Sequence, residues 1–120
     1  MNESLQVGIE GRSSHIVTAD MAPGHLPRVV LSTPSMIRLV EGSCHQAAES
    51  HLDAGETTVG THVCVSHTGA VLEGESFDVQ VRLAEINKRR LTFDVSVIGP
   101  RGSVSEGTHE RAVVKLDRMG

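Results

Sequence analysis

Aromatic residues are almost absent from this 120-residue sequence: they make up 2 % of it, with two phenylalanines, no tyrosine and no tryptophan. A hydrophobic core must therefore consist mainly of valine, leucine, isoleucine, alanine and methionine. Proteins that bind single-stranded nucleic acids stack bases on aromatic side chains, which this chain lacks. Lys and Arg number 11 against 15 Asp and Glu, a formal net charge of −4, so no basic excess is available for phosphate backbones. Nucleic acid is not an expected partner.

Long apolar segments are missing as well. No run approaches the roughly 20 residues that span a bilayer, and the first eleven residues lack the basic start and apolar stretch of a signal peptide. Cys44 lies in an apolar helical pattern and Cys64 in a strand-like run, which favours buried free thiols in a reducing compartment, although the sequence leaves a disulfide open. We expect a cytoplasmic protein with no membrane contact and a single domain over residues 1–120.

One segment, Thr33 to Leu52, has helical periodicity. Threonine before proline is typical of a helix start, so we predict Thr33 as the N-cap and Pro34 as the first helical residue. Apolar residues recur at spacings of three and four and form one stripe. The stripe consists of Met36, Ile37, Val40, Cys44, Ala47, Ala48 and Leu52. At about 100° per residue, Glu41 falls on the flank of this stripe. The helix alone favours a solvated carboxylate there, with the border of a cleft as the alternative.

Strand patterns lie on both sides of this helix. Ahead of it we predict short strands at 5–10 and 15–19 with a turn between them, and then a loop rich in proline and glycine. After the helix, four segments are rich in β-branched residues or alternate apolar and polar residues. These segments are 58–71, 76–86, 91–97 and 104–116.

The connections at 87–88 and 99–102 are short, which makes the last three strands antiparallel neighbours. This order predicts an α+β fold, in which an antiparallel sheet wraps around one helix so that each apolar face is covered. A sheet of this kind has exposed edges, and a second copy of the chain would cover one of them.

Few motifs point to chemistry. The seven histidines lack the spacing of metal ligands, and there is no Cys-x-x-Cys or His-Glu-x-x-His, so we expect no metal site. The chain does offer a hydroxyl at the helix start (Thr33), a carboxylate on the helix (Glu41) and an imidazole that we place inside an apolar strand (His67). Such groups serve acyl transfer or general-base catalysis, with backbone amides near Gly60 or the helix start for an oxyanion. A chance combination is the alternative, because periodicity does not bring these groups together.

Two runs resemble the fluoroacetyl-CoA thioesterase family of the hotdog superfamily. They are Thr61 to Thr68 (Thr-His-Val-Cys-Val-Ser-His-Thr) and Gly107 to Val114 (Gly-Thr-His-Glu-Arg-Ala-Val-Val). The resemblance extends from the helix to the C-terminus, and spacings of eight and seven residues between functional positions agree with the family pattern. It implies catalytic roles for Thr33, Glu41 and His67, and substrate contacts for Gly60 and Arg111.

The same resemblance implies a hotdog fold, in which two copies join their sheets and place active sites near the dimer interface. It implies hydrolysis of a small acyl-CoA without a cofactor, because CoA is part of the substrate. Glu41 would be the nucleophile or the general base for water, His67 would transfer protons, Thr33 would orient the carboxylate, and Arg111 would hold the acyl group. The expected assembly is a homodimer or a higher oligomer.

One stretch departs from the family pattern. Residues 24–28 read Gly-His-Leu-Pro-Arg, whereas the fluoroacetyl enzyme has phenylalanines in this region that form a lid favouring the fluorinated acyl group. We therefore expect a different short-chain specificity. Two other functions are open: an acyl-CoA-binding module without turnover, and a hotdog enoyl-CoA hydratase or dehydratase.

Simpler roles are also available to several of these residues. Arg111 would then form a surface ion pair with Glu110 or Glu106, and Thr33 would only cap the helix. We expect His109 to be structural and both cysteines to serve in packing.

Overall fold

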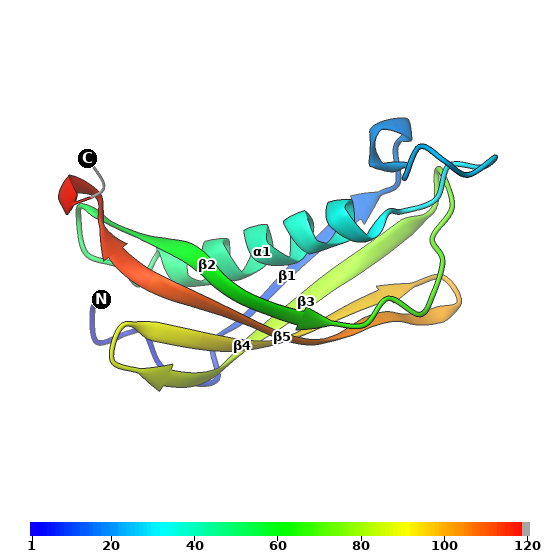
Figure 1. The fold of residues 1–120 in the computed structure, drawn as a ribbon. Coiled ribbons are helices and arrows are strands. Elements are labelled where there is room, and N and C mark those ends of the chain that lie inside the picture. Colours follow the sequence, from blue (N-terminus) through cyan, green and yellow to red (C-terminus); the bar gives the residue numbers. More distant parts are fainter. Residues whose placement is uncertain (119–120) are drawn as a thin grey trace.

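The computed structural model describes residues 1–118. One long helix, α1 (Thr33–Glu49), packs against a five-stranded antiparallel sheet with the strand order β1-β3-β4-β5-β2. The strands are β1 (Glu10–Ile16), β2 (Glu56–Val65), β3 (Ser76–Asn87), β4 (Arg90–Gly99) and β5 (Gly102–Lys115), and the short 3-10 helices are η1 (Ala19–Met21) and η2 (Leu116–Arg118). Figure 1 shows the sheet curling around α1, which confirms the predicted α+β architecture.

The core lies between α1 and the inner face of the sheet. The alternation predicted for the two central strands is confirmed, because every second side chain is buried. These side chains are Phe77, Val79, Val81 and Leu83 on β3 and Leu91, Phe93, Val95 and Val97 on β4. Both phenylalanines of the chain are therefore in the core, where burial of one such side chain stabilises the fold by about 1.5–3 kcal/mol.

The two tight connections also lie where the sequence predicts them. Asn87 pairs with Arg90 across the β3–β4 hairpin, and Lys88 adopts a left-handed conformation with φ of 57°. Gly99 pairs with Gly102 across the β4–β5 hairpin. These short loops fix the register of the three long strands.

The N-terminal strands were predicted wrongly. In place of two strands with a turn at 11–14, one strand runs from Glu10 to Ile16 and pairs with β3. Two of its inner positions are small rather than apolar: a Cβ on Gly11 would lie 3.1 Å from the Cβ of Ala47, and the Ser13 hydroxyl hydrogen-bonds Ser43 at 2.6 Å. This strand packs closely on α1 with small residues, so it lacks the apolar alternation by which strands are predicted.

Strand β2 lies at one edge of the sheet and is shorter than predicted, ending at Val65 rather than at residue 71. A β-bulge interrupts its pairing with β5 between Gly60 and His62. Every residue from Gly60 to Cys64 is exposed. Cys64 is thus exposed and not buried as predicted, whereas Cys44 is buried; both thiols are free.

Within residues 1–118, no helix combines the length and the apolar character needed to cross a membrane.

Candidate active site

The first group of candidate residues lies at the N-terminus of α1. Ser32, not Thr33, is the N-cap, and its hydroxyl accepts a hydrogen bond from the Ser35 amide. The Thr33 hydroxyl is free of that role and hydrogen-bonds Nδ1 of His67 at 2.7 Å. Thr33 therefore contacts the imidazole, and not the Glu41 carboxylate that the resemblance implied.

His67 lies two residues beyond the end of β2 and not inside a strand as predicted. Backbone hydrogen bonds on both sides hold it against β5: the Ser66 amide donates to Glu106 at 3.0 Å, and the Thr68 amide donates to Val104 at 2.8 Å. Its ring is partly buried. Because Nδ1 faces Thr33, Nε2 is the nitrogen available to water or substrate.

A second group surrounds Gly60 on β2. A Cβ placed on this glycine would lie 3.3 Å from Oε2 of Glu41, 3.3 Å from Nη1 of Arg111 and 3.2 Å from Cε1 of His109. The helix contributes the carboxylate and β5 contributes the other two side chains. Glu41 is partly buried on the flank of α1. Among residues 1–118, no hydrogen bond or ion pair engages its carboxylate, so its lone pairs remain available.

Arg111 is buried, with 7 % of its surface exposed, and does not form the surface ion pair that was the simpler alternative. Its Nε donates to the Thr58 hydroxyl at 2.8 Å, and its Nη2 donates to the Thr58 carbonyl at 3.0 Å. Burial lowers the pKa of the guanidinium, which nevertheless stays charged at neutral pH. A buried cation thus stands beside the Glu41 carboxylate.

His109 also belongs to this second group, although the sequence indicated only a structural role. It is 1 % exposed. Its Nδ1 donates to the His62 carbonyl at 2.8 Å, and its Nε2 accepts from Nη1 of Arg111 at 3.0 Å. Burial lowers the pKa of the ring. The one available signal was its position two residues before Arg111, which puts both side chains on the same face of a strand.

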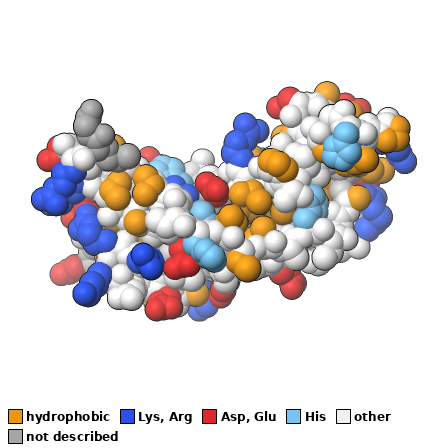
Figure 2. Space-filling view, in the orientation of Figure 1, with side chains coloured by type: hydrophobic (Ala, Val, Ile, Leu, Met, Phe, Trp, Pro, Cys, Tyr) orange, Lys and Arg blue, Asp and Glu red, His pale blue; other side chains and the backbone are white. Residues whose placement is uncertain are grey.

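No hydrogen bond or ion pair of residues 1–118 joins the two groups. Thr33 and Glu41 are eight residues apart on one helix, which corresponds to about 12 Å along its axis. Gly60 and His67 are seven residues apart along β2 and its continuation, or roughly 20 Å. Figure 2 shows histidine, acidic and hydrophobic side chains gathered in a hollow across this face of the molecule.

A cavity of about 400 Å³ adjoins the first group. Thr33 and His67 line it together with the loop that precedes α1 and the segment that follows β2. Its apolar lining includes Pro23, Leu26 and Val30, and no aromatic side chain. From the lid position at residues 24–28, His25 and Leu26 border this cavity.

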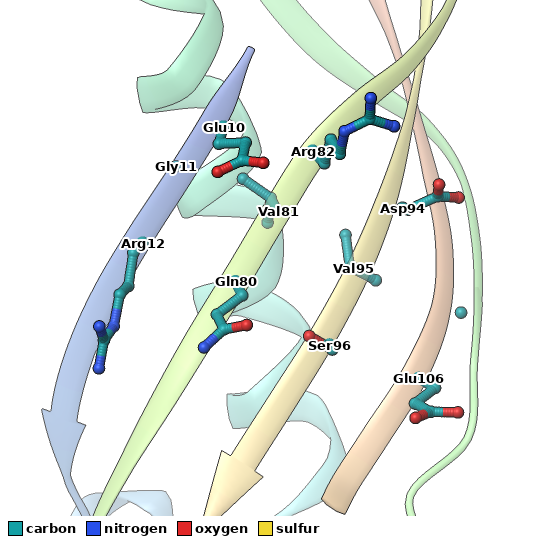
Figure 3. Close-up of a pocket in the computed structure, with 11 residues that line it drawn as sticks. Glu10, Gly11, Arg12, Gln80, Val81, Arg82, Asp94, Val95, Ser96 and Glu106 are labelled. Atoms are coloured by element: carbon teal, nitrogen blue, oxygen red, sulfur yellow. The ribbon is translucent and has the colours of Figure 1, made fainter. Parts of the chain in front are cut away.

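A larger cavity, about 720 Å³, lies elsewhere. It is on the outer face of the sheet, and Figure 3 shows its polar side chains on the side of β1, β3, β4 and β5 that faces away from α1. Glu10, Arg82 and Asp94 stand opposite one another on adjacent strands and alternate in sign. None of the candidate catalytic residues lines this cavity, so we do not assign the active site to it.

Comparison with known proteins identifies the family. Residues 12–117 match the family described as fluoroacetyl-CoA-specific thioesterase. A fluoroacetyl-CoA thioesterase from Streptantibioticus cattleyicolor is 37 % identical to the chain over 90 residues, which is 75 % of the chain and 65 % of that relative. The chain belongs to the fluoroacetyl-CoA-specific thioesterase family. This confirms the resemblance that the two sequence runs and the spacings indicated.

Solved structures agree with this family assignment. A variant of the fluoroacetyl-CoA-specific thioesterase, crystallised in complex with fluoroacetate and CoA, is 30 % identical, with a TM-score of 0.90 over 97 % of this chain and 100 % of that one. A hot-dog-like protein from Thermanaerovibrio acidaminovorans is 21 % identical, with a TM-score of 0.90 over 98 % of this chain and 90 % of that one. The second likeness concerns the fold alone, and it confirms the hotdog architecture.

Proposed function

We propose that this protein hydrolyses a small acyl-CoA to the free acid and CoA. The observation that carries the proposal is the Glu41 carboxylate, which has no hydrogen-bond partner among residues 1–118 and adjoins the space over Gly60 beside the Arg111 cation. A carboxylate with free lone pairs, next to a buried positive charge and an open glycine surface, is suited to a polar carbonyl group. The family relative bound to fluoroacetate and CoA carries the two products of such a reaction.

In the proposed reaction, Glu41 attacks the thioester carbonyl carbon directly or removes a proton from a water molecule that does so. The carbon–sulfur bond breaks, the CoA thiolate takes a proton from His67, and the proton that Glu41 removes from water returns to the imidazole. If Glu41 itself attacks, an acyl–Glu41 anhydride forms, and water hydrolyses it to release the acid and restore the carboxylate. Thr33 holds the imidazole by its hydrogen bond to Nδ1, which directs Nε2 to the leaving group. Arg111 faces the negative charge that develops on the carbonyl oxygen, and Gly60 leaves room for the acyl carbonyl.

We also propose that the complete site forms across a homodimer. Strand β2 is an unpaired edge among the described residues, and its exposed segment runs from Gly60 to Cys64. Antiparallel pairing of two β2 edges about a two-fold axis near Val63 and Cys64 would place Gly60 of one chain beside His67 of its partner. Glu41 and Arg111 of one chain would then share a substrate with the other chain's histidine.

For the acyl group, we propose a short aliphatic chain rather than fluoroacetyl. The cavity beside Thr33 and His67 is lined by Leu26 and Val30 and lacks aromatic side chains. Its volume of about 400 Å³ is within the usual range for a small-ligand site. The apolar residues of this lining are all aliphatic, which favours apolar acyl groups.

The activity can be tested by mixing the protein with a panel of short acyl-CoAs and a thiol reagent that reports free CoA. We expect CoA release by the wild type and a loss of at least about 10³-fold in kcat for Glu41→Gln and for His67→Ala. Glu49→Gln, at an exposed position of the same helix, is the matched control and should be unaffected. Binding without release would favour the binding module, and loss of enoyl-CoA absorbance would favour the hydratase.

Gly60 offers a test of the geometry. Gly60→Ala would put a methyl group 3.2–3.3 Å from Glu41, His109 and Arg111, so these side chains must move by a few tenths of an ångström. We expect kcat/KM to fall by about 10–100-fold with little change in Tm. The control is Gly42→Ala, the residue after Glu41, where a Cβ meets nothing within 4 Å. Equal kinetics for the two variants would contradict the placement of the site.

A further inference from the structure

Arg111 is held in an unusual way for a buried cation. All three of its nitrogens donate to neutral acceptors: Nε to the Thr58 hydroxyl at 2.8 Å, Nη2 to the Thr58 carbonyl at 3.0 Å, and Nη1 to Nε2 of His109 at 3.0 Å. No carboxylate of residues 1–118 forms an ion pair with it. The Glu41 carboxylate faces the same space over Gly60 but forms no ion pair with the guanidinium. Because an unpaired buried charge is costly, and because neutral acceptors fix the orientation of the guanidinium, the arrangement keeps a positive charge available to a ligand.

The hydrogen bonds of His109 determine its protonation state. The His62 carbonyl can only accept, so Nδ1 of His109 must carry the proton of the 2.8 Å bond between them. Nη1 of Arg111 can only donate, so Nε2 must be unprotonated to accept the 3.0 Å bond. A protonated ring would point an N–H at the guanidinium and add a second positive charge beside it. We call the hydrogen bonds from Arg111 to Thr58 and His109 the clamp. The clamp requires a neutral His109 ring.

The clamp also reaches the helix that carries Glu41. The Thr58 hydroxyl makes a second hydrogen bond, 2.8 Å long, to Nδ1 of His45. His45 is four residues after Glu41 and so lies one turn further along the same side of α1. Thr58 is 5 % exposed. One buried threonine thus connects the arginine of β5 to the helix.

We infer that Thr58 and His109 are positioning residues that hold the Arg111 guanidinium as a cation without an ion-pair partner among residues 1–118. Its Nη1 faces the space over Gly60, where it would meet the developing oxyanion of the thioester. A guanidinium has five N–H groups, and this clamp uses three of them, which leaves one on each Nη for substrate. The inference rests on the proposed thioesterase activity for its ligand, but the clamp itself is testable without turnover.

The matched pair Thr58→Val and Thr58→Ser distinguishes the effect of the Thr58 hydroxyl from the effect of side-chain volume. Valine keeps the volume and removes the acceptor of Nε and the link to His45, whereas serine keeps the hydroxyl. We expect Thr58→Val to lower kcat/KM by about 10–100-fold and Thr58→Ser to stay within about 3-fold of wild type. Circular dichroism and Tm confirm that both variants fold. Wild-type kinetics in a folded Thr58→Val variant would overturn the inference.

A spectroscopic readout keeps the test independent of activity. In a protein with ¹⁵N-labelled arginine, the Nε–H proton of Arg111 should give a slowly exchanging NMR signal, assigned by its loss in Arg111→Lys. We expect that signal in the wild type and Thr58→Ser, and its loss in Thr58→Val. Its persistence in Thr58→Val would overturn the clamp, whereas a wild type that shows the signal but releases no CoA would overturn the proposed function only.

The neutral state of His109 can be tested through pH. The charged groups around its ring are Arg111 and Glu110 on β5 and Glu41 on α1, and the backbone carbonyl of His62 on β2 accepts its hydrogen bond. Burial lowers the pKa of His109 below its ordinary 6.5, so as pH falls below about 6.5 the unfolded chain binds a proton that the folded ring resists, and stability falls.

His109→Gln retains an acceptor for Nη1 but does not titrate. Between pH 7.5 and 5, its unfolding free energy should decrease less than that of the wild type. His109→Leu, which has no acceptor, should lose kcat/KM like Thr58→Val, while His109→Gln should retain most of it. Equal pH dependence of stability in wild type and His109→Gln, or equal kinetics in the two variants, would contradict the assignment.

Discussion

A heterodimer of one Glu41→Gln chain and one His67→Ala chain is expected to release CoA at about half the wild-type rate per dimer, although neither homodimer is active. The physical reason is the separation of the two groups within one chain. Thr33 holds His67 at the start of α1, whereas Glu41 faces Gly60 about 12 Å further along the helix. If each site takes its carboxylate from one chain and its imidazole from the other, the heterodimer has one intact site and one that lacks both groups.

The heterodimer can be obtained by co-expressing the chains with two different C-terminal affinity tags and purifying on both. A reciprocal heterodimer, one wild-type chain with one chain carrying both substitutions, makes the control. If the sites are shared between chains, each of the two sites in this reciprocal heterodimer lacks either the Glu41 carboxylate or the His67 imidazole. The reciprocal heterodimer should then be inactive. If instead each chain forms its own site, the results are reversed: the reciprocal heterodimer has half the activity and the first has none.

Replacing Gly107 with alanine is expected to destabilise the fold by about 4 kcal/mol or more, among the largest effects of a single substitution. A Cβ at this position would lie 2.0 Å from the carbonyl oxygen of Cys64 and 2.8 Å from the Cα of Val65. These are backbone atoms of the paired strand β2, so no side-chain rotation relieves the clash, and β2 must separate from β5. Because β2 carries Gly60 and leads to His67, we expect the site to be lost with the pairing.

Thermal or urea unfolding measures this effect, with Ser105→Ala as the control on the same strand. The Ser105 hydroxyl is buried and has no hydrogen-bond partner among the described residues, so its removal should be neutral or stabilising by about 1 kcal/mol. A Gly107→Ala protein as stable as Ser105→Ala would show that the close approach of the two strands is not required.

Much of the fold could be predicted because its signals are local. The stripe of α1, the alternation in β3 and β4 and the turns at 87–88 and 99–102 each depend on residues a few positions apart. β1 could not be predicted in this way, because its contact with α1 consists of Gly11 and Ser13 against Ala47 and Ser43. Small residues give no periodic apolar signal, and only the partner surface shows that they are buried.

The cap of α1 shows how a tertiary contact changes the meaning of a local signal. Thr33 before Pro34 is a suitable N-cap by sequence, but Ser32 takes that position and leaves the threonine hydroxyl to His67. The sequence contains two adjacent hydroxyl residues, each able to accept the capping hydrogen bond. Which of the two residues caps α1 depends on tertiary structure. The segment that follows β2 brings His67 to the start of the helix, where it takes the Thr33 hydroxyl.

The sequence by itself determined the family, the single helix and its stripe, and the identities of the candidate residues, because motif, spacing and periodicity are properties of the chain order. Only the tertiary structure decided that these residues form two groups, one around His67 and one around Gly60, and that Arg111 is buried in a clamp of neutral acceptors. The physical reason is that hydrogen bonds and burial depend on distances between strands and helix, and residues far apart in sequence set those distances.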